Sequence, residues 1–470
     1  FSNIEIKYIS KRTSGDIDLK TPLSEMSTEG VFTDDLRKDL ISNNCDLIVH
    51  SWKDLPLDLG ENTIIAGSLE RADQRDILFI KKNRIDTLKN NKTINIFSSA
   101  PRRIYNLKPF IKNFLPFSTE RVIFKNIRGN IPTRFKKFLE SDVDGFIVAK
   151  AAVDRLVNNK LKDFEHLSKK IKKYIDECIW TIVPLSQNPT SPGQGALGLE
   201  IRKNDNQIEK IIKLISDPLT LHCVNEERKI LELYGGGCHQ KIGISYFPTF
   251  FGIMKSEKGE TDKGSNFYKW KSIQKKKIQT KKINENLLFP SNLEDYNLFE
   301  RNEIKDSIEK INSIEYHCIW ISRKSALPKN VNINSSNIIW TSGIKTWESL
   351  AKKGVWINGT SDGMGEDFNP NIGFLAPFPW IKLTHNKSPS SLIENTIFTY
   401  ELKELPIKED LDKKNFFYWM SSSAFHYAVR KNPSILDKHH SCGPGNTYNA
   451  IKKMIKNSEK LEIDLSYLEW

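Results

Sequence analysis

Residues 93–150 read TINIFSSAPRRIYNLKPFIKNFLPFSTERVIFKNIRGNIPTRFKKFLESDVDGFIVAK, and this stretch decides the fold class of the first half of the chain. Its runs TINIF, RVIFK and GFIVA are short and rich in β-branched and aromatic residues, whereas TRFKKFLESD has a helical pattern. Short β-rich runs that alternate with helical patterns are typical of βαβ units with mostly parallel strands. The stretch therefore predicts an α/β fold.

The same alternation extends toward the start of the chain. The segments IEIKYIS at 4–10 and CDLIVHS at 45–51 are predicted to be strands, and VFTDDLRKDLISNN at 31–44 is predicted to be a helix between them. Together these segments extend the predicted α/β region to the N-terminus of the sequence.

Downstream of residue 200 the pattern changes. Two helices are predicted over 206–234, and the second is stopped by the glycines that begin at Gly235. The Lys-, Glu- and Asn-rich segment 255–312 is weakly patterned, with a loop predicted at 255–266 and a domain boundary near 290–312. After that boundary, strand ends that lead into loops and helices predict a second α/β unit at 318–327, 337–343, 416–425 and 442–453.

The composition narrows the class of protein. The 470 residues are 38% hydrophobic and 27% charged, which is typical of a soluble globular chain of several domains. No apolar run approaches the roughly 18 residues that span a bilayer, and no secretion or transit signal is found, although the chain begins with Phe rather than Met. The net charge of +13 is consistent with an anionic ligand, but the basic runs lack the interleaved aromatics of a nucleic-acid platform.

Polar motifs follow three of the predicted strands. They are HSWKDLP at 50–56, SSAPRR at 98–103 and RGNIPTR at 128–134. Because ligands of α/β sheets bind at the carboxyl ends of strands, these loops are the candidate site. Asp54 is able to stabilise a cation, and arginine forks bind carboxylates, although each residue type also occurs on solvated surfaces. The motifs therefore predict a site for a ligand with several carboxylates.

The six cysteines suggest one reactive thiol rather than a metal or disulfide site. They are scattered without a CxxC pair, which favours a reducing cytoplasm. Cys238 follows three glycines and is predicted to be exposed, whereas four others are predicted to be buried: Cys45, Cys178, Cys223 and Cys318. His439 and His440 have no third ligand in the sequence, so no metal is expected.

These motifs occur together, and in this order, in one family. HSWKDLP, SSAPRR, IRGNIPTR, SPGQGALGLEIR and GGGCHQKIG resemble the porphobilinogen deaminases (hydroxymethylbilane synthases) over about residues 4–245. The resemblance implies two periplasmic-binding-protein-like α/β domains and a small α+β third domain, with the active site between the first two. From the residues alone, Gly193-Gln194-Gly195 is a tight turn that leads into a strand.

The resemblance also implies roles for individual residues. Cys238 would carry a covalent dipyrromethane cofactor, and Asp54 would be the catalytic carboxylate that stabilises the azafulvenium cation left when ammonia departs. Further cofactor-binding residues would be Ser51, Lys53, Ser99, Arg102, Arg103 and Arg128, and substrate-binding residues would be Arg134, Arg155 and Gln194. The partner would be porphobilinogen, bound by a monomeric cytoplasmic enzyme that contacts neither nucleic acid nor membranes.

Three features depart from the family pattern. No Arg-x-Ser-x-Leu-Ala segment is found in FSNIEIKYIS, so a contributor to the site is absent from the sequence as given. Glu25 and Glu29 stand where relatives usually have lysines near a flexible loop, and Pro101 replaces a common leucine. We expect the two glutamates to affect chain elongation.

The residues from 313 onward resemble a second family, the uroporphyrinogen-III synthases. FFYWMSSSAFHYAV places Tyr427 after a Ser-rich turn, and CGPGNTYNAIKK places Thr447 at a helix N-terminus suited to an anion. The resemblance implies a bifunctional fusion, while the alternative is a degenerate accessory domain.

The predicted domain organisation and the alternatives follow from these resemblances. The limits are 1–70 with 196–215 for domain 1, 71–195 for domain 2, 216–290 for domain 3, 291–312 for a linker and 313–470 for the synthase-like α/β domain. Two other functions stay open: an anion-binding protein of the periplasmic type without catalysis, and nucleic-acid binding driven by charge. An exposed thiol on three glycines favours the enzyme, since a pure binding protein does not need one.

Overall fold

The structure of this chain is a computed structural model that divides into two compact units. It describes residues 4–11, 33–236, 240–273, 284–293, 296–388, 393, 395–468 and 470. The first unit consists of Phe1–Phe110, Thr119–Pro248 and Met254–Trp270, and the second of Ile111–Ser118, Thr249–Ile253 and Lys271–Trp470.

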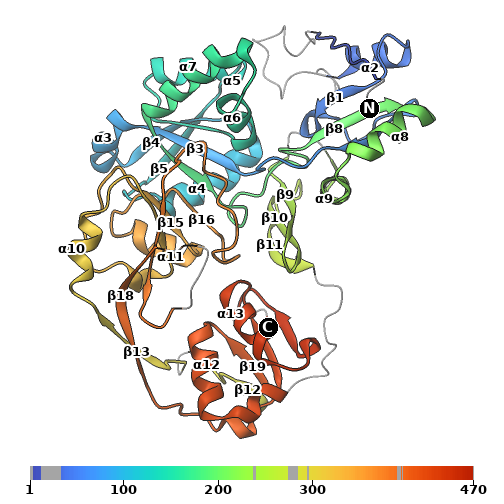
Figure 1. The fold of residues 1–470 in the computed structure, drawn as a ribbon. Helices are drawn as coiled ribbons and strands as arrows, with labels where there is room; N and C mark the ends of the chain where they lie inside the picture. The colour runs from blue at the N-terminus through green and yellow to red at the C-terminus, as the bar shows by residue number, and fades with distance from the viewer. Residues whose placement is uncertain are drawn as a thin grey trace. The chain divides into compact units, whose positions relative to one another are not determined.

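The first sheet of the first unit, sheet A, joins segments that are far apart in the sequence. Its order is β1 (Ile48–Ser51), β8 (Leu197–Arg202) and β2 (Thr63–Ser68), and both pairings are antiparallel. Helices α2 (Asp34–Ile41) and α8 (Asn206–Ile215) contact the strands, as Figure 1 shows. The return of β8 to this sheet places the strand after the Gly193 turn beside the strand that carries the HSWKDLP motif.

Two predictions fail in this part of the chain. The expected parallel order is wrong for sheet A, because β8 enters from a distant segment and runs antiparallel to both neighbours. Residues 4–11 contain no strand, so the strand predicted at 4–10 is wrong. Its alternating apolar side chains are largely exposed, Ile6 by 68% and Ile9 by 62%, because within the described residues no strand pairs with this segment.

The second sheet, sheet B, confirms the α/β prediction made from residues 93–150. Its order is β5-β4-β6-β3-β7, in which β4 is parallel to β5 and β6 while β3 is antiparallel to β6 and β7. The strands are β3 (Asp76–Lys81), β4 (Thr93–Phe97), β5 (Arg121–Lys125), β6 (Gly145–Ala149) and β7 (Cys178–Val183). Every residue of β3 and of β6, the middle strand, is buried, so these two neighbouring strands lie in the core of this domain.

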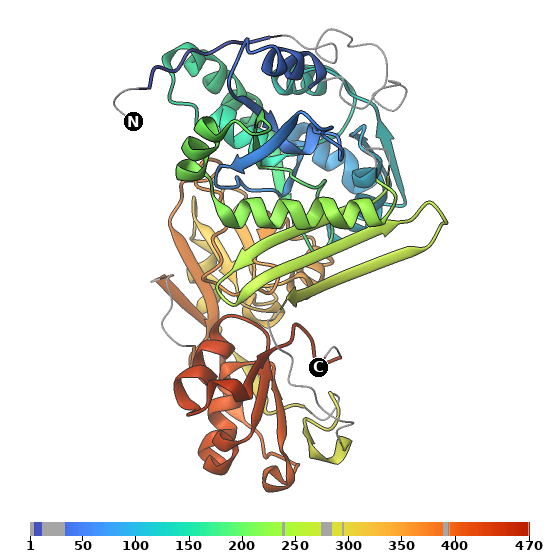
Figure 2. The same cartoon turned by 90° about the vertical axis from the view of Figure 1, so that its right-hand side faces the viewer.

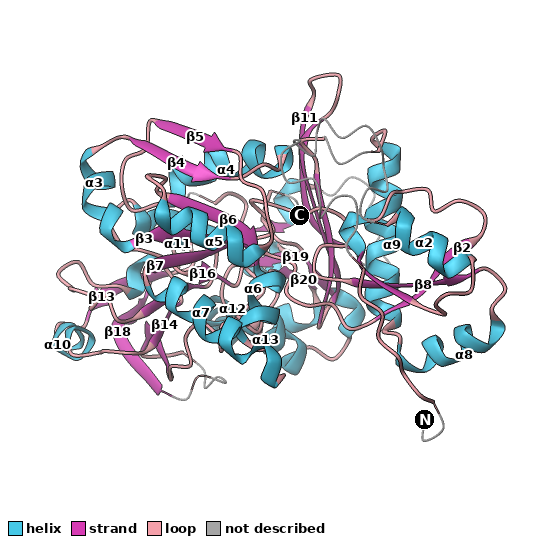
Figure 3. Cartoon of the chain, turned by 90° about the horizontal axis from the view of Figure 1, so that it is seen from above, coloured by secondary structure: helices cyan, strands magenta, loops and turns pink. Residues whose placement is uncertain are grey.

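Helices connect and cover the strands of sheet B. They are α3 (Ile85–Asn90), α4 (Pro101–Phe114), α5 (Ile131–Glu140), α6 (Lys150–Val157) and α7 (Glu165–Asp176). Figure 3 shows these helices running along the strands. Because β4 and β5 are parallel, the starts of α4 and α5 lie at the same edge of the sheet, so the SSAPRR and RGNIPTR segments are brought together.

The third part of the first unit combines the predicted helices with a three-stranded sheet, sheet C. Helix α9 (Pro218–Leu233) precedes β9 (Gly243–Thr249), β10 (Gly252–Glu260) and β11 (Asn266–Ile273), and Figure 2 shows the helix lying along the strands. The loop predicted at 255–266 is half right: residues 261–265 form the turn between β10 and β11, whereas residues 255–260 belong to β10. Its polar residues are tolerated in the strand because they have partners: buried Glu257 pairs with Lys255 and Lys269.

The second unit contains a six-stranded sheet, sheet E. The order is β13-β18-β17-β14-β15-β16, with only the β13–β18 pair antiparallel. The strands are β13 (Phe299–Glu303), β14 (Cys318–Ile321), β15 (Ile338–Thr341), β16 (Gly359–Thr360), β17 (Trp380–His385) and β18 (Asn395–Glu404), accompanied by α10 (Ser307–Asn312) and α11 (Ile344–Ala351). The prediction of a further α/β region is thus confirmed.

A four-stranded parallel sheet, sheet D, completes the second unit. Its order is β12 (Leu288–Phe289), β19 (Phe416–Trp419), β20 (His439–Cys442) and β21 (Leu461–Ile463). Helices α12 (Ser422–Lys431) and α13 (Asn446–Met454) pack side by side against it. The chain therefore starts sheet D, builds all of sheet E, and then returns to finish sheet D.

This chain path corrects the predicted linker. Residues 291–312 contain β13 and α10 rather than a connection without structure. Strand β12 pairs with β19, so the C-terminal α/β region begins before residue 313. This region contains two separate sheets, D and E. The apolar run of β12 is too short for its partner to be predicted from the sequence. No helix in the described ranges is both long enough and apolar enough to cross a membrane.

Candidate active site

The predicted catalytic residue lies at the end of β1. A short 3₁₀ helix, η1 (Trp52–Asp54), continues the strand, and the backbone N–H of Trp52 donates to the Ala196 carbonyl at 3.1 Å. Trp52 is buried, Lys53 is half-buried and Asp54 is exposed. The buried tryptophan thus anchors a turn that presents the Asp54 carboxylate to solvent.

Cations from three segments gather near this carboxylate. Burial lowers the pKa of Arg134 at the start of α5, the like charges of Arg103 and Arg128 lower it further, and Asp54 acts in the opposite direction. Burial likewise lowers the pKa of Lys53, which Asp54 raises and Arg103 lowers. These mutual effects require the groups to lie close together. The structure therefore brings five of the predicted site residues into one cluster, called the cationic cluster below: Lys53, Asp54, Arg103, Arg128 and Arg134.

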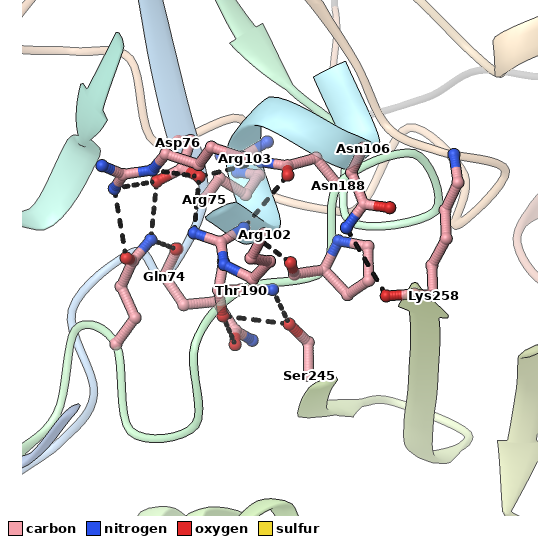
Figure 4. A network of polar contacts seen from close by, with 12 residues as sticks. Gln74, Arg75, Asp76, Arg102, Arg103, Asn106, Asn188, Thr190, Ser245 and Lys258 are labelled. Atoms are coloured by element: carbon pink, nitrogen blue, oxygen red, sulfur yellow. Dashed lines mark hydrogen bonds and ion pairs between the residues drawn. The ribbon is translucent and has the colours of Figure 1, made fainter. Parts of the chain in front are cut away.

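A buried carboxylate that the motifs did not reveal organises one side of this cluster. Asp76, the first residue of β3, accepts two hydrogen bonds from Arg103, Nη2 to Oδ1 at 2.7 Å and Nε to Oδ2 at 3.0 Å (Figure 4). Arg102 Nη2 also donates to it at 3.1 Å. Burial by itself would raise the pKa of the Asp76 carboxyl, but Arg103 and Arg102 hold it below its usual range. An aspartate that opens a wholly buried strand needs a cationic partner, and that signal could have found it.

Two residues predicted to contact a ligand are buried and donate hydrogen bonds to Asp76. Gln194 is 1% exposed, and its amide donates to Asp76 Oδ1 at 2.8 Å and to the Gln74 carbonyl. Arg102 is 4% exposed, and its Nη1 donates to Asn188 Oδ1 at 3.0 Å (Figure 4). Both side chains therefore hold Asp76 and Arg103 in place, which the sequence could not show because their partners are distant along the chain.

The remaining predicted residues lie around the cluster. Ser99 Oγ accepts from the Ile127 N–H at 2.9 Å and donates to the Ile127 carbonyl at 3.1 Å, so it fixes the loop that carries Arg128. Arg155 is exposed and donates to the Gly195 carbonyl at 3.0 Å. Ser51 is the last residue of β1 and is half-buried opposite Leu197. Their predicted contacts with cofactor or substrate stay predictions.

The tight turn predicted at Gly193–Gly195 is confirmed. Gly193 has φ 77° and Gly195 has φ 87°, and β8 begins two residues later. A Cβ on Gly193 would lie 3.1 Å from the backbone nitrogen of Lys53, so the turn packs directly on η1. Glycine is required here for both its conformation and its close approach to the Asp54 segment.

A buried ion pair fixes this turn from the other side. Glu227 of α9 is fully buried and accepts from Arg71 at 2.7 and 2.9 Å, from the Gly193 N–H at 2.8 Å and from the Tyr246 N–H at 2.7 Å. The carboxylate thus accepts four hydrogen bonds from three segments of the first unit. Arg71 Nε also donates to the Gln194 carbonyl at 2.9 Å.

The predicted attachment residue lies outside the described residues. Helix α9 ends at Leu233, Gly235 and Gly236 have positive φ, and the described chain stops just before Gly237, Cys238 and His239. Glu25 and Glu29 also lie outside the described residues.

The other cysteines behave mainly as small buried side chains. Burial raises the pKa of Cys178 to about 12, of Cys223 to about 11 and of Cys318 to about 12, so these thiols stay protonated. The prediction that they are buried is confirmed, whereas Cys45 is only half-buried.

A second group of cations lies in the second unit. His385 is the last residue of β17, and burial together with Arg323, Lys382 and Arg301 lowers its pKa to about 4. Its Nε2 lies 3.4 Å from the Ser423 hydroxyl in the first turn of α12. The carboxyl ends of β14 and β17 lie at one edge because the strands are parallel, and Arg323 follows β14 there. None of these residues was singled out in the sequence.

The two residues predicted for this region differ in exposure. Thr447 is half-buried in the first turn of α13, as expected. Tyr427 is 4% exposed, and its hydroxyl donates to the Leu405 carbonyl at 2.8 Å, so it packs inside the fold. His440 is a neutral structural histidine: Trp419 Nε1 donates to its Nδ1 at 2.9 Å, and its Nε2 donates to the Ile435 carbonyl at 3.0 Å.

Comparison with known proteins identifies the family. Residues 2–210 match the family model described as porphobilinogen deaminase, dipyromethane cofactor binding domain. The chain is 35% identical over 243 residues to the porphobilinogen deaminase of Chlorobium phaeovibrioides. The aligned residues cover 52% of this chain and 69% of that protein. This chain belongs to the porphobilinogen deaminase family. It is also 34% identical over 260 residues to the probable porphobilinogen deaminase of Sulfurisphaera tokodaii, covering 54% and 78% of the two chains.

Solved structures give a weaker comparison. The YhfZ protein from Shigella flexneri aligns over 45% of this chain and 77% of its own, with a TM-score of 0.21 and 14% identity, which is too low to carry an argument. The family membership therefore rests on the sequence matches.

The residues of the first unit fit the cofactor of this family. The matched domain is described as the one that binds the dipyrromethane cofactor. The family resemblance implies that this cofactor carries acetate and propionate groups. The cationic cluster has four cationic side chains and one exposed carboxylate. Burial is the main cause of the lowered pKa of Arg134, and repulsion by Arg103 and Arg128 adds to it. Anionic ligand groups would relieve that repulsion.

Proposed function

We propose that the first half of the chain is a hydroxymethylbilane synthase, which condenses four porphobilinogen molecules head to tail with release of ammonia in tetrapyrrole biosynthesis. The observation that carries this proposal is the cationic cluster, in which Lys53 and Arg134 interact with the charge of the exposed Asp54 carboxylate and Arg103 and Arg128 lie near Arg134. Family membership supports the reaction type and the substrate.

The roles of the cluster follow from charge. The arginine forks bind the acetate and propionate groups of substrate and cofactor and hold the pyrrole rings near η1. Asp54 accepts a hydrogen bond from a pyrrole N–H and stabilises the positive charge that develops as ammonia leaves the substrate. Asp76 keeps Arg103 oriented through two hydrogen bonds. When bound, the dipyrromethane on Cys238 supplies the pyrrole ring to which the first substrate is joined.

Intact mass tests the proposal. We expect the purified protein to carry a mass excess of two pyrrole units and to react with Ehrlich's aldehyde reagent, and we expect Cys238→Ala to lose both the excess mass and all turnover. Cys45→Ala is the matched control, because it removes a half-buried thiol far along the chain and should keep the cofactor. A protein that stays unmodified after incubation with porphobilinogen would instead support an anion-binding protein without catalysis.

For the second unit we propose a uroporphyrinogen-III synthase-like activity, which would make the chain bifunctional. The observation that favours it is the group around His385, the last residue of β17: Arg323 after β14, Arg301 within β13 and Ser423 in the first turn of α12. A carboxylate-rich linear tetrapyrrole would meet two arginines and a helix N-terminus there. Two α/β sheets joined by a returning chain also agree with a two-lobed enzyme.

The isomer of the cyclised product tests this second proposal. Without a synthase the linear product closes to the symmetric isomer, so we expect the asymmetric isomer from the whole protein and porphobilinogen. Arg323→Met should shift the product toward the symmetric isomer by about tenfold, as expected for loss of a charge-assisted contact. Lys324→Met, at the exposed neighbouring position, should leave the ratio unchanged. Only symmetric product from the unaltered protein would contradict the proposal.

A further inference from the structure

We propose that Arg228 of α9 is a positioning residue. It holds residues 52–57, which include Asp54, against the end of α9, where the cofactor-attachment segment begins. The inference rests on the proposed deaminase function. It assigns to α9 a role in catalysis although the helix contributes no member of the cationic cluster.

Arg228 binds the backbone directly after Asp54. Its Nη1 donates to the Leu55 carbonyl at 3.2 Å, and its Nη2 donates to the carbonyls of Pro56 and Leu57, the latter at 3.2 Å. One guanidinium therefore joins three consecutive carbonyls. None of these carbonyls belongs to a strand, and Arg228 is their only donor among the hydrogen bonds of the described residues.

Packing brings the same segment onto α9. Trp52 and Leu55 form a buried cluster with Val224, one turn before Arg228 on the helix, and with Ala196 of the turn before β8. At the far end, a Cβ on Gly236 would lie 2.8 Å from Leu57 Cδ1. Residues 52–57 thus follow the last turns of α9 and reach the glycines that precede Cys238.

The chemistry of this contact requires arginine. A planar guanidinium presents five N–H donors in a fixed fork, which suits several carbonyls at once, whereas a lysine ammonium is a shorter point charge on a flexible stem. All three of these acceptors are backbone atoms, so through these bonds Arg228 acts on the position of the segment. A displacement of Asp54 by about 1 Å is enough to lower a rate about a hundredfold.

Two readouts test the inference in the whole protein. In Arg228→Lys and Arg228→Met we expect faster amide hydrogen exchange in the peptide that covers residues 50–58, with exchange in the strands of sheet B unchanged. We also expect kcat to fall about 10- to 100-fold while KM changes less than about twofold. Lys229→Met is the matched control, since this exposed neighbour pairs only with Glu226 in the hydrogen bonds of the described chain.

The outcomes separate this inference from the proposed function. Unchanged exchange at residues 50–58 in both variants would overturn the positioning role, whether or not the protein turns over porphobilinogen. Faster exchange with an unaltered kcat would also overturn it, because the clamp would then be merely structural. If the unaltered protein binds no cofactor and makes no product, the proposed function fails, and the exchange experiment still decides whether Arg228 holds the segment.

Discussion

Asp54→Asn is expected to reduce kcat by about 10²- to 10⁴-fold while the protein stays folded and keeps its cofactor. The amide is nearly isosteric with the carboxylate, but it lacks the negative charge that stabilises a developing cation. Asp54 is exposed and is not among the core side chains, so stability should change little. Steady-state turnover of porphobilinogen measures the first effect, and intact mass measures cofactor retention.

Asp58→Asn is the matched control for this substitution. Asp58 is also exposed and lies four residues further along the same segment, where its Oδ1 accepts from the Gly60 N–H at 2.8 Å. It should keep full activity, since it lies outside the cationic cluster. An active Asp54→Asn protein would remove Asp54 from the mechanism and leave the arginines as a binding site alone.

The second large effect is expected in stability. Glu227→Gln should lower the free energy of unfolding of the first unit by about 3–5 kcal/mol, because it leaves Arg71 as a buried charge without a counterion. The amide also cannot accept four hydrogen bonds in the pattern that the carboxylate provides. Chemical denaturation followed by tryptophan fluorescence measures the change.

Glu226→Gln provides the comparison on the same helix. Glu226 is half-buried and pairs with the exposed Lys229 at 2.7 Å, an interaction of the kind that contributes under about 1 kcal/mol. If Glu227→Gln were no more destabilising than this control, the four-donor carboxylate would be of little energetic importance and the turn at Gly193 would be held by packing alone.

The sequence predicts the parts of this molecule that depend on local order. The strands β4, β5 and β6 of sheet B and the helices α8 and α9 were expected where they lie, whereas β3 and β7 were not predicted. The polar loops after β1, β4 and β5 were expected to form one site. A periodic apolar pattern is enough to predict each of these strands and helices. The loops after β4 and β5 are predicted to meet because parallel strands bring their carboxyl ends to one edge of the sheet.

The sequence does not predict partners that are distant along the chain. The contact of Asp76 with Arg103 forms only because β3 brings them together, and the buried partners of Gln194 and Arg102 are likewise distant along the chain. The ligand roles that the family resemblance implies for Gln194 and Arg102 stay predictions. The cations around His385 are Arg301 in β13, Arg323 after β14 and Lys382 in β17, and no sequence motif joins them. Likewise, the polar run in β10 resembles a loop until the lysines that neutralise Glu257 are known.

The order in which the chain forms the strands of the second unit affects its folding during synthesis. Strand β12 emerges from the ribosome early, but its partner β19 is synthesised more than a hundred residues later, and sheet D closes only with β21 near the C-terminus. In a nascent chain the apolar pair Leu288 and Phe289 therefore has no strand partner throughout the synthesis of sheet E. Sheet D is thus the last part of this unit to form, and a premature stop after sheet E would leave it without three of its four strands.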